Sequence, residues 1–220
     1  MIKAIVFDFD GVIVDSEKIW LDTKIKSLRI NNIQIKKDVN TKSFIGVSSN
    51  IFFRKFIPKK NYRNILKKVT KSYNNLLIKK FSQNPKLNKG IRDILSIPDI
   101  KFGIVSNNSK KFILKSLMSH KILKYFKKKF IIALRNNKFR KPLPYGYLKI
   151  LKELNCKTNE IIVIEDSVTG IKAAKKAKIK YIFRYNPLRI KNVNHCVNIN
   201  SLNSFKTHCT KLINGAVRET

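Results

Sequence analysis

The pattern of apolar and polar residues divides the chain at about residue 85. Helical spacing prevails before this point, after one short apolar run at the start, and strand-like apolar runs alternate with helical stretches after it. Residues 3–8 form an apolar run that ends in an aspartate, and this run predicts a short buried strand. Residues 15–31 carry apolar side chains at roughly helical spacing and predict a helix. From there to about residue 84 no strand-rich segment is evident. The stretches VNTKSFIG, SSNIFFRKFI and YRNILKKVTKSYNNLLIKKF predict short helices with apolar stripes.

After residue 85, short apolar runs alternate with amphipathic stretches. The runs predict strands at 102–106, 130–134, 160–165 and 180–185, and the stretches predict helices at 109–119, 144–155 and 167–178. The tail can add a strand at 197–199 and a helix at 201–213. Such alternation predicts an α/β fold, a Rossmann-like parallel sheet with helices on both faces. Residues 1–15 and 85–220 would form this core, and residues 16–84 an all-helical insert.

Polar side chains follow four of the predicted strands. They are Asp8 and Asp10 after 3–8, Ser106 and Asn107 at the end of 102–106, Lys141 in the loop after 130–134, and Glu165 and Asp166 at the end of 160–165. In open parallel sheets, ligands bind beyond the carboxyl ends of the strands. We therefore expect these side chains to form one site.

The grouped acids indicate a metal-assisted reaction on phosphate. Carboxylates held close together repel one another, and a divalent cation removes that penalty. Oxygen ligands suit Mg²⁺. A cation, a lysine, a hydroxyl and backbone N–H groups together suit a phosphoryl group. Each piece alone has an ordinary structural explanation, such as a turn or a helix cap, but their order along the strands favours a site.

Net charge adds a competing interpretation. The chain has 48 Lys and Arg against 13 Asp and Glu, a formal net charge of +35. Such a charge favours non-specific, salt-sensitive binding to polyanions. The excess is mainly lysine, spread along the whole chain, and A/T-rich codon usage explains it equally well. We therefore expect no specific nucleic-acid partner. We expect a monomer that binds a small phosphorylated metabolite.

The remaining composition predicts a cytoplasmic protein. The three cysteines include no CxxC pair, which is typical of a reducing compartment. No apolar run approaches the roughly 18 residues that a membrane-spanning helix needs, and the first residues lack the layout of a signal peptide.

Five segments together resemble one known family. They are DFDGVIVDSE (8–17), FIGVSS (44–49), IVSNN (104–108), RKPLP (140–144) and IVIEDSVTGIKAAKKA (162–177). The chain resembles the haloacid dehalogenase-like superfamily over about residues 1–186, in the branch of phosphatases and phosphomutases with a helical cap. It looks most similar to sugar-phosphate phosphatases of the 6-phosphogluconate type, related to β-phosphoglucomutase. The helical insert would then be the cap.

The resemblance implies roles for the two aspartates of DFD. Asp8 would be the nucleophile that forms an aspartyl-phosphate. Asp10 would be the general acid that protonates the leaving alcohol, and then the general base for the attacking water. Mg²⁺ would be held by Asp8, Asp10 and Asp166, with Glu165 acting through a water molecule.

The resemblance also implies the groups that hold the phosphate. Ser106 and Lys141 would bind its oxygens, and Gly11 and Asn107 would offer backbone N–H groups. Gly46, in the expected cap loop, would lie over the phosphate because glycine allows the backbone to approach closely.

Two departures from the family pattern bear on the reaction. Trp20 stands where the mutases have a histidine, and Ser49 where they have an arginine. Both favour hydrolysis, so a Mg²⁺-dependent phosphatase acting on a small phosphorylated metabolite is the leading hypothesis. A hexose-phosphate mutase similar to β-phosphoglucomutase is the second, and a catalytically inactive basic protein that binds polyanions is the third.

Overall fold

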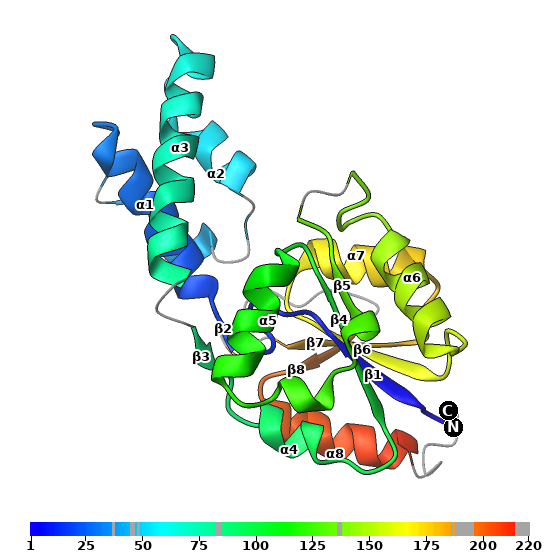
Figure 1. Cartoon of the computed structure of the whole chain (residues 1–220). Helices are drawn as coiled ribbons and strands as arrows, with labels where there is room; N and C mark the ends of the chain where they lie inside the picture. The colour runs from blue at the N-terminus through cyan, green and yellow to red at the C-terminus, as the bar shows by residue number, and fades with distance from the viewer. Residues whose placement is uncertain are drawn as a thin grey trace. The chain divides into compact units, whose positions relative to one another are not determined.

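A six-stranded sheet is the centre of the computed structural model of this chain (Figure 1). Its strands are β1 (Ala4–Phe7), β4 (Lys101–Ser106), β5 (Ile131–Ala133), β6 (Ile161–Glu165), β7 (Tyr181–Tyr185) and β8 (Val197–Ile199). They lie in the order β5-β4-β1-β6-β7-β8, and every neighbouring pair is parallel. This confirms the predicted α/β class and its parallel sheet.

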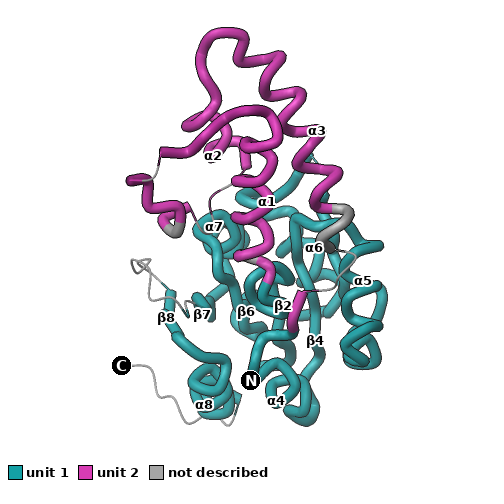
Figure 2. Tube along the Cα trace, turned by 90° about the vertical axis from the view of Figure 1, so that its left-hand side faces the viewer, with its two compact units in different colours: residues 1–15, 87–220 teal, residues 16–86 magenta. Residues whose placement is uncertain are grey.

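The structure describes residues 1–36, 38–44, 47, 49–81, 85–135, 138–185, 187 and 196–213. Contacts divide the chain into two units, Met1–Asp15 with Leu87–Thr220, and Ser16–Lys86 (Figure 2). Within the described residues, no helix has both the length and the apolar character needed to cross a membrane.

Helices cover both faces of the sheet in the first unit (Figure 1). One face packs on α4 (Ile91–Leu95), α5 (Lys110–Ser119) and α8 (Leu202–Ile213), and the other on α6 (Tyr145–Leu154) and α7 (Val168–Lys176). Strand β1 serves both layers, because successive side chains of a strand point to opposite faces. Ile5 and Phe7 enter the first core, whereas Ala4 and Val6 enter the second. Short 3₁₀ helices η2 (Leu123–Tyr125) and η3 (Lys128–Phe130) lead into β5.

The 3₁₀ helices η2 and η3 and three further short elements were not predicted from the sequence. Helix α4 is only five residues long, and β2 (Val14–Asp15) and β3 (Lys86–Leu87) have two residues each. Elements this short carry too few side chains to show a period. Strand β2 also corrects the start of the first helix, since α1 (Glu17–Ile30) begins only after β2 ends.

The second unit is built from helices around an aromatic core. It holds α1, η1 (Thr41–Phe44), α2 (Ser49–Phe56) and α3 (Tyr62–Phe81). The expected short helix near residue 62 is instead one helix of 20 residues. Phe44, Phe52 and Phe53 pack together in its core, and Tyr73 of α3 packs edge-on against Phe53. That this unit acts as a cap stays a prediction.

Candidate active site

The central strand β1 delivers Asp8 to the carboxyl edge of the sheet, between the ends of β4 and β6. Phe7 pairs with Ile104 on one side and with Ile164 on the other. The backbone N–H of Asp8 continues this ladder by donating to the Ile164 carbonyl at 2.9 Å. Residues that are far apart in sequence therefore meet at one place, as the positions of the strand ends predict.

Lys141 links two of the expected site residues through buried ion pairs. Its Nζ lies 2.7 Å from Asp8 Oδ1 and also donates to Glu165 Oε1. Burial disfavours the charged ammonium, but the charges of Asp8 and Glu165 outweigh it, and the pKa of Lys141 lies above its ordinary value. The lysine is therefore a fixed cation beside Asp8.

Glu165 is fully buried and held on both carboxylate oxygens. Tyr147 donates from its hydroxyl to Oε1 at 2.5 Å, and Ser167 Oγ lies 3.3 Å from Oε2. Burial raises the pKa of Glu165 to about 7, and the charge of Lys141 opposes that rise. Helix α7 makes room for this carboxylate at Gly170, where a Cβ atom would overlap it. The expected contact of Glu165 with a metal-bound water stays a prediction.

Asp8, Glu165 and Asp166 offer carboxylate oxygens that lie within 4.8 Å of one another. Oxygen donors of this kind fit Mg²⁺. Because both Glu165 oxygens already accept hydrogen bonds, Asp8 and Asp166 fit the ion best as direct side-chain ligands. Gly11 makes the approach of Asp166 possible: its φ is +82°, and a Cβ there would overlap the Asp166 carboxylate.

Asp10 is oriented from β4 and the residues that follow it. Ser106 Oγ lies 3.4 Å from Asp10 Oδ2, and Asn108 Nδ2 lies 3.3 and 3.1 Å from Asp10 Oδ1 and Oδ2. The side chain of Asp10 is thus turned toward β4, on the side of Asp8 away from β6. The carboxylates that converge are those of Asp8, Glu165 and Asp166, so the backbone carbonyl of Asp10 is the better candidate for its expected contact with a metal.

One expected phosphate donor, the Gly11 N–H, has another partner in the structure. The Gly11 N–H donates to the Val14 carbonyl at 2.8 Å, because the chain turns tightly there, so this N–H is not available as the sequence interpretation required. Asn107 uses its side chain to hold the backbone of Lys141: Oδ1 accepts from the Lys141 N–H at 3.0 Å, and Nδ2 donates to the Lys141 carbonyl at 3.4 Å. The Asn107 side chain therefore positions the loop that carries the lysine, and the expected role of its backbone N–H at the phosphate stays a prediction.

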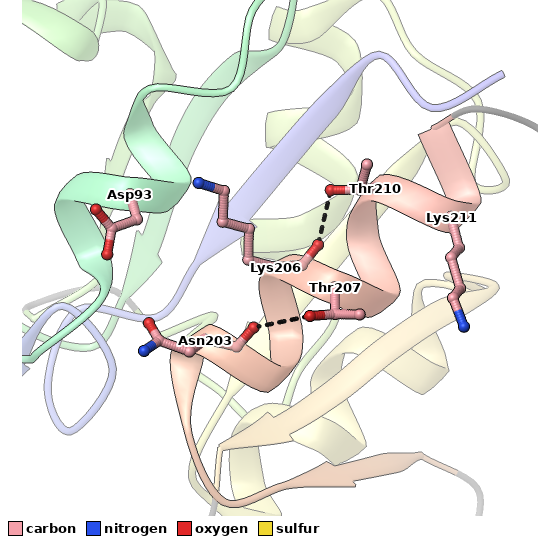
Figure 3. Close-up of a pocket in the computed structure, with 6 residues that line it drawn as sticks. All are labelled: Asp93, Asn203, Lys206, Thr207, Thr210 and Lys211. Carbon is pink, nitrogen blue, oxygen red and sulfur yellow. Dashed lines mark hydrogen bonds between the residues drawn. The ribbon is translucent and has the colours of Figure 1, made fainter.

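Gly46 lies outside the described residues, so its expected place over the phosphate stays a prediction. A hollow of about 540 Å³ lies elsewhere, on α4 and α8 (Figure 3). Its threonine hydroxyls donate to carbonyls of their own helix, and Lys206 and Lys211 point in different directions (Figure 3). The hollow therefore offers no convergent set of donors. It is lined by Asp93, Asn203, Lys206, Thr207, Thr210 and Lys211.

The sequence pattern of the haloacid dehalogenase-like hydrolases matches residues 5–184. The chain belongs to this family. The match spans every strand end of the site, from Asp8 to Asp166, and it confirms the resemblance drawn from the sequence motifs.

Curated and solved relatives agree with that membership in the haloacid dehalogenase-like hydrolase family. A phosphorylated carbohydrates phosphatase from Thermotoga maritima is 27% identical over 188 residues, which are 82% of this chain and 84% of the relative. The structure of a haloacid dehalogenase-like protein from Agrobacterium tumefaciens has a TM-score of 0.77 at 20% identity, covering 97% of this chain and 100% of that one. A β-phosphoglucomutase from Clostridium difficile has a TM-score of 0.70 at 24% identity, covering 99% and 100%. The two structures show a shared fold.

Sequence reasoning missed three polar residues of this hydrolase site. Asn108 contacts Asp10, Tyr147 contacts Glu165, and Asn88 Nδ2 donates to the carbonyls of Gly11 and Val12 at 2.8 Å each. Asn108 could have been found, since it directly follows Ser106 and Asn107 at the end of β4. Tyr147 lies on the apolar face of α6 and reads as an ordinary core aromatic residue. Asn88 precedes α4, which the pattern did not reveal.

Proposed function

We propose that this chain is a Mg²⁺-dependent phosphatase that hydrolyses a small phosphorylated metabolite, above all a sugar phosphate, through an aspartyl-phosphate on Asp8. One observation carries the proposal: Asp8 lies at the end of the central strand in contact with Lys141, with Asp166 close on one side and Asp10 on the other. A nucleophile, a fixed cation, an acid and a metal-capable pair of carboxylates thus belong to one sheet edge.

In the first step, a carboxylate oxygen of Asp8 attacks phosphorus, and the bond from phosphorus to the ester oxygen breaks. The departing alkoxide takes a proton from the Asp10 carboxyl group. In the second step, water attacks phosphorus and gives a proton to Asp10, while the bond to Asp8 breaks and phosphate is released. Lys141 keeps Asp8 in place and offers positive charge near the phosphoryl oxygens.

Asp8 and Asp166 would hold Mg²⁺, with the Asp10 carbonyl as a third ligand from the chain. When bound, Mg²⁺ neutralises charge on the phosphoryl oxygens and on the clustered carboxylates. Glu165 helps to position Lys141, because its buried carboxylate forms an ion pair with the Lys141 ammonium.

The substrate class is supported by the relative from Thermotoga maritima, which is named for its action on phosphorylated carbohydrates. Hydrolysis, not transfer between hydroxyls of one sugar, is supported by Trp20 and Ser49, which replace the histidine and arginine of mutases. We further propose a monomer in the cytoplasm whose lysine-rich surface binds polyanions only without specificity.

Phosphate release from a panel of sugar phosphates, phosphoglycolate and p-nitrophenyl phosphate tests the proposal. Turnover should require Mg²⁺, and an Asp8→Asn preparation made in parallel reports any contaminating phosphatase. Isomerisation of β-glucose 1-phosphate without phosphate release would favour the mutase instead. No Mg²⁺-dependent release above the Asp8→Asn preparation, combined with a nucleic-acid complex stable at physiological salt, would favour the inactive polyanion-binding protein.

A further inference from the structure

We infer that Asn108 is a positioning residue that fixes the Asp10 carboxyl group for proton transfer to the leaving alcohol. The inference rests on the proposed phosphatase function and goes beyond the roles that the family resemblance implies. The evidence is the set of hydrogen bonds that Asn108 makes, in which each of its polar groups contacts a defined partner.

Asn108 is buried and locked at the junction between β4 and α5, with 7% of its surface exposed. Its backbone N–H donates to Ser106 Oγ at 3.0 Å. Its side-chain Oδ1 accepts from the backbone N–H of Ser109 at 2.7 Å. Since Oδ1 is committed to Ser109, the amide nitrogen Nδ2 must point the other way, and there it meets both oxygens of Asp10.

Two residues of β4 and the segment that follows it, Ser106 and Asn108, contact the Asp10 carboxyl group. Asp10 itself lies in a tight turn that begins at Phe9 and includes Gly11, and its backbone forms a β-bridge to Val14. Ser106 Oγ accepts from the backbone N–H of Asn108, so the Asn108 side chain itself contributes the Nδ2 contact with Asp10.

The orientation of the general acid affects the rate of hydrolysis more strongly when the leaving group is more basic. A sugar hydroxyl leaves as a strongly basic alkoxide, so its departure requires a proton from a well-placed acid. A p-nitrophenolate ion is stable without a proton, so its departure does not. Misplacing Asp10 should therefore slow the hydrolysis of a sugar phosphate selectively.

The test compares kcat for the best sugar phosphate of the panel with kcat for p-nitrophenyl phosphate in the same preparation. Asn108→Asp is the informative variant, because its carboxylate can still accept from the Ser109 N–H but cannot donate to Asp10. Asn108→Ala removes the same donor without adding a charge. The ratio of kcat for the sugar phosphate to kcat for p-nitrophenyl phosphate does not depend on how much of a preparation is folded. Ser109→Ala is the matched control, since it removes the side-chain cap of α5, the Oγ that accepts from the Phe112 N–H, and spares the donor to Asp10.

We expect both Asn108 variants to lose about 10- to 100-fold in kcat on the sugar phosphate, as misplaced groups in general acid catalysis typically do. The same variants should lose less than about threefold on p-nitrophenyl phosphate, and Ser109→Ala should leave the ratio unchanged. Equal losses on the two esters, or no loss in either Asn108 variant, would overturn the role of Asn108 while leaving the phosphatase intact. A wild-type protein inactive on both esters would overturn the proposed function and this inference with it.

Discussion

Replacing Tyr147 by Phe removes one hydroxyl from the centre of the site and should destabilise the fold measurably. Tyr147 is fully buried on α6, and its hydroxyl donates to Glu165 Oε1 at 2.5 Å. Phenylalanine fills the same space, so the packing of the ring against the second core is kept. The variant therefore isolates the loss of one hydrogen bond to a buried carboxylate.

The expected loss follows from the burial of Glu165. Hydrogen bonds to charged groups contribute about 1.5–3 kcal/mol, and a buried acceptor that loses its partner cannot turn to water. Glu165 keeps Lys141 and Ser167 as partners, which places the expected loss in the free energy of unfolding at about 1–3 kcal/mol.

The loss should also depend on pH in a defined direction. Burial raises the pKa of Glu165 to about 7 in the folded chain, above an ordinary glutamate value of about 4.3 in the unfolded chain. The stability from protonated Glu165 is therefore fully present below about pH 4.3 and is lost as pH rises through about 7. Without the tyrosine donor, the carboxylate is harder to ionise, so the folded-state pKa rises further. The difference between wild type and Tyr147→Phe should thus be small in acid and open as pH rises past 7.

Urea denaturation in EDTA, followed by far-UV circular dichroism at pH 5 and pH 8, measures this difference. Tyr145→Phe is the matched control on the same helix: Tyr145 stacks its ring on Phe139 at 4.9 Å, and phenylalanine keeps that stack. The control should change the free energy of unfolding by less than about 0.5 kcal/mol. A Tyr147→Phe loss no larger than that of the control, at both pH values, would refute the role given to the buried Tyr147–Glu165 contact.

Three further predictions follow from the same site. Gly170→Ala should lower the free energy of unfolding by about 1–3 kcal/mol in thermal or urea denaturation, because its Cβ overlaps the Glu165 carboxylate; a gain in stability, usual for Gly→Ala in a helix, would contradict this. Gly11→Ala should lower the free energy of unfolding by about 1–2 kcal/mol, because alanine disfavours the left-handed φ of +82°. It should also raise the Mg²⁺ concentration needed for half-maximal activity, since its Cβ displaces Asp166. An unchanged Mg²⁺ titration of the variant would argue against Asp166 as a ligand. EDTA should abolish phosphate release, and Mg²⁺ but not Ca²⁺ should restore it, because Ca²⁺ takes longer bonds and more ligands; equal rates with the two ions would count against the metal assignment.

The sequence was informative where its pattern is repeated and poor where a feature depends on a single contact. The continuous apolar runs of β1, β4 and β6 predicted a buried parallel sheet, and its topology placed Asp8, Ser106 and Glu165 at one edge. A run of this kind predicts where a strand ends, and this in turn predicts which polar residue lies at the edge of the sheet.

The partners of each side chain could not be predicted in the same way. Whether the Gly11 N–H faces a ligand or the Val14 carbonyl depends on the dihedral angles of one turn. Tyr147 has the spacing of a core residue, and only the folded arrangement of α6 against β6 brings its hydroxyl to Glu165. The contact of Asn107 with the backbone of Lys141 joins residues 34 positions apart, for which the pattern of either segment gives no sign.

The covalent role of Asp8 is tested most directly by trapping. An acyl phosphate is reduced by borohydride to an alcohol, so rapid quenching of the enzyme during turnover of a sugar phosphate, reduction and peptide mass spectrometry should find homoserine at position 8. The modification should need both substrate and Mg²⁺. Asp8→Asn should show no homoserine at position 8. It should keep less than about a thousandth of wild-type activity, which is typical of the loss of a nucleophile. Steady turnover with residue 8 unmodified, or an active Asp8→Asn protein, would contradict the aspartyl-phosphate mechanism.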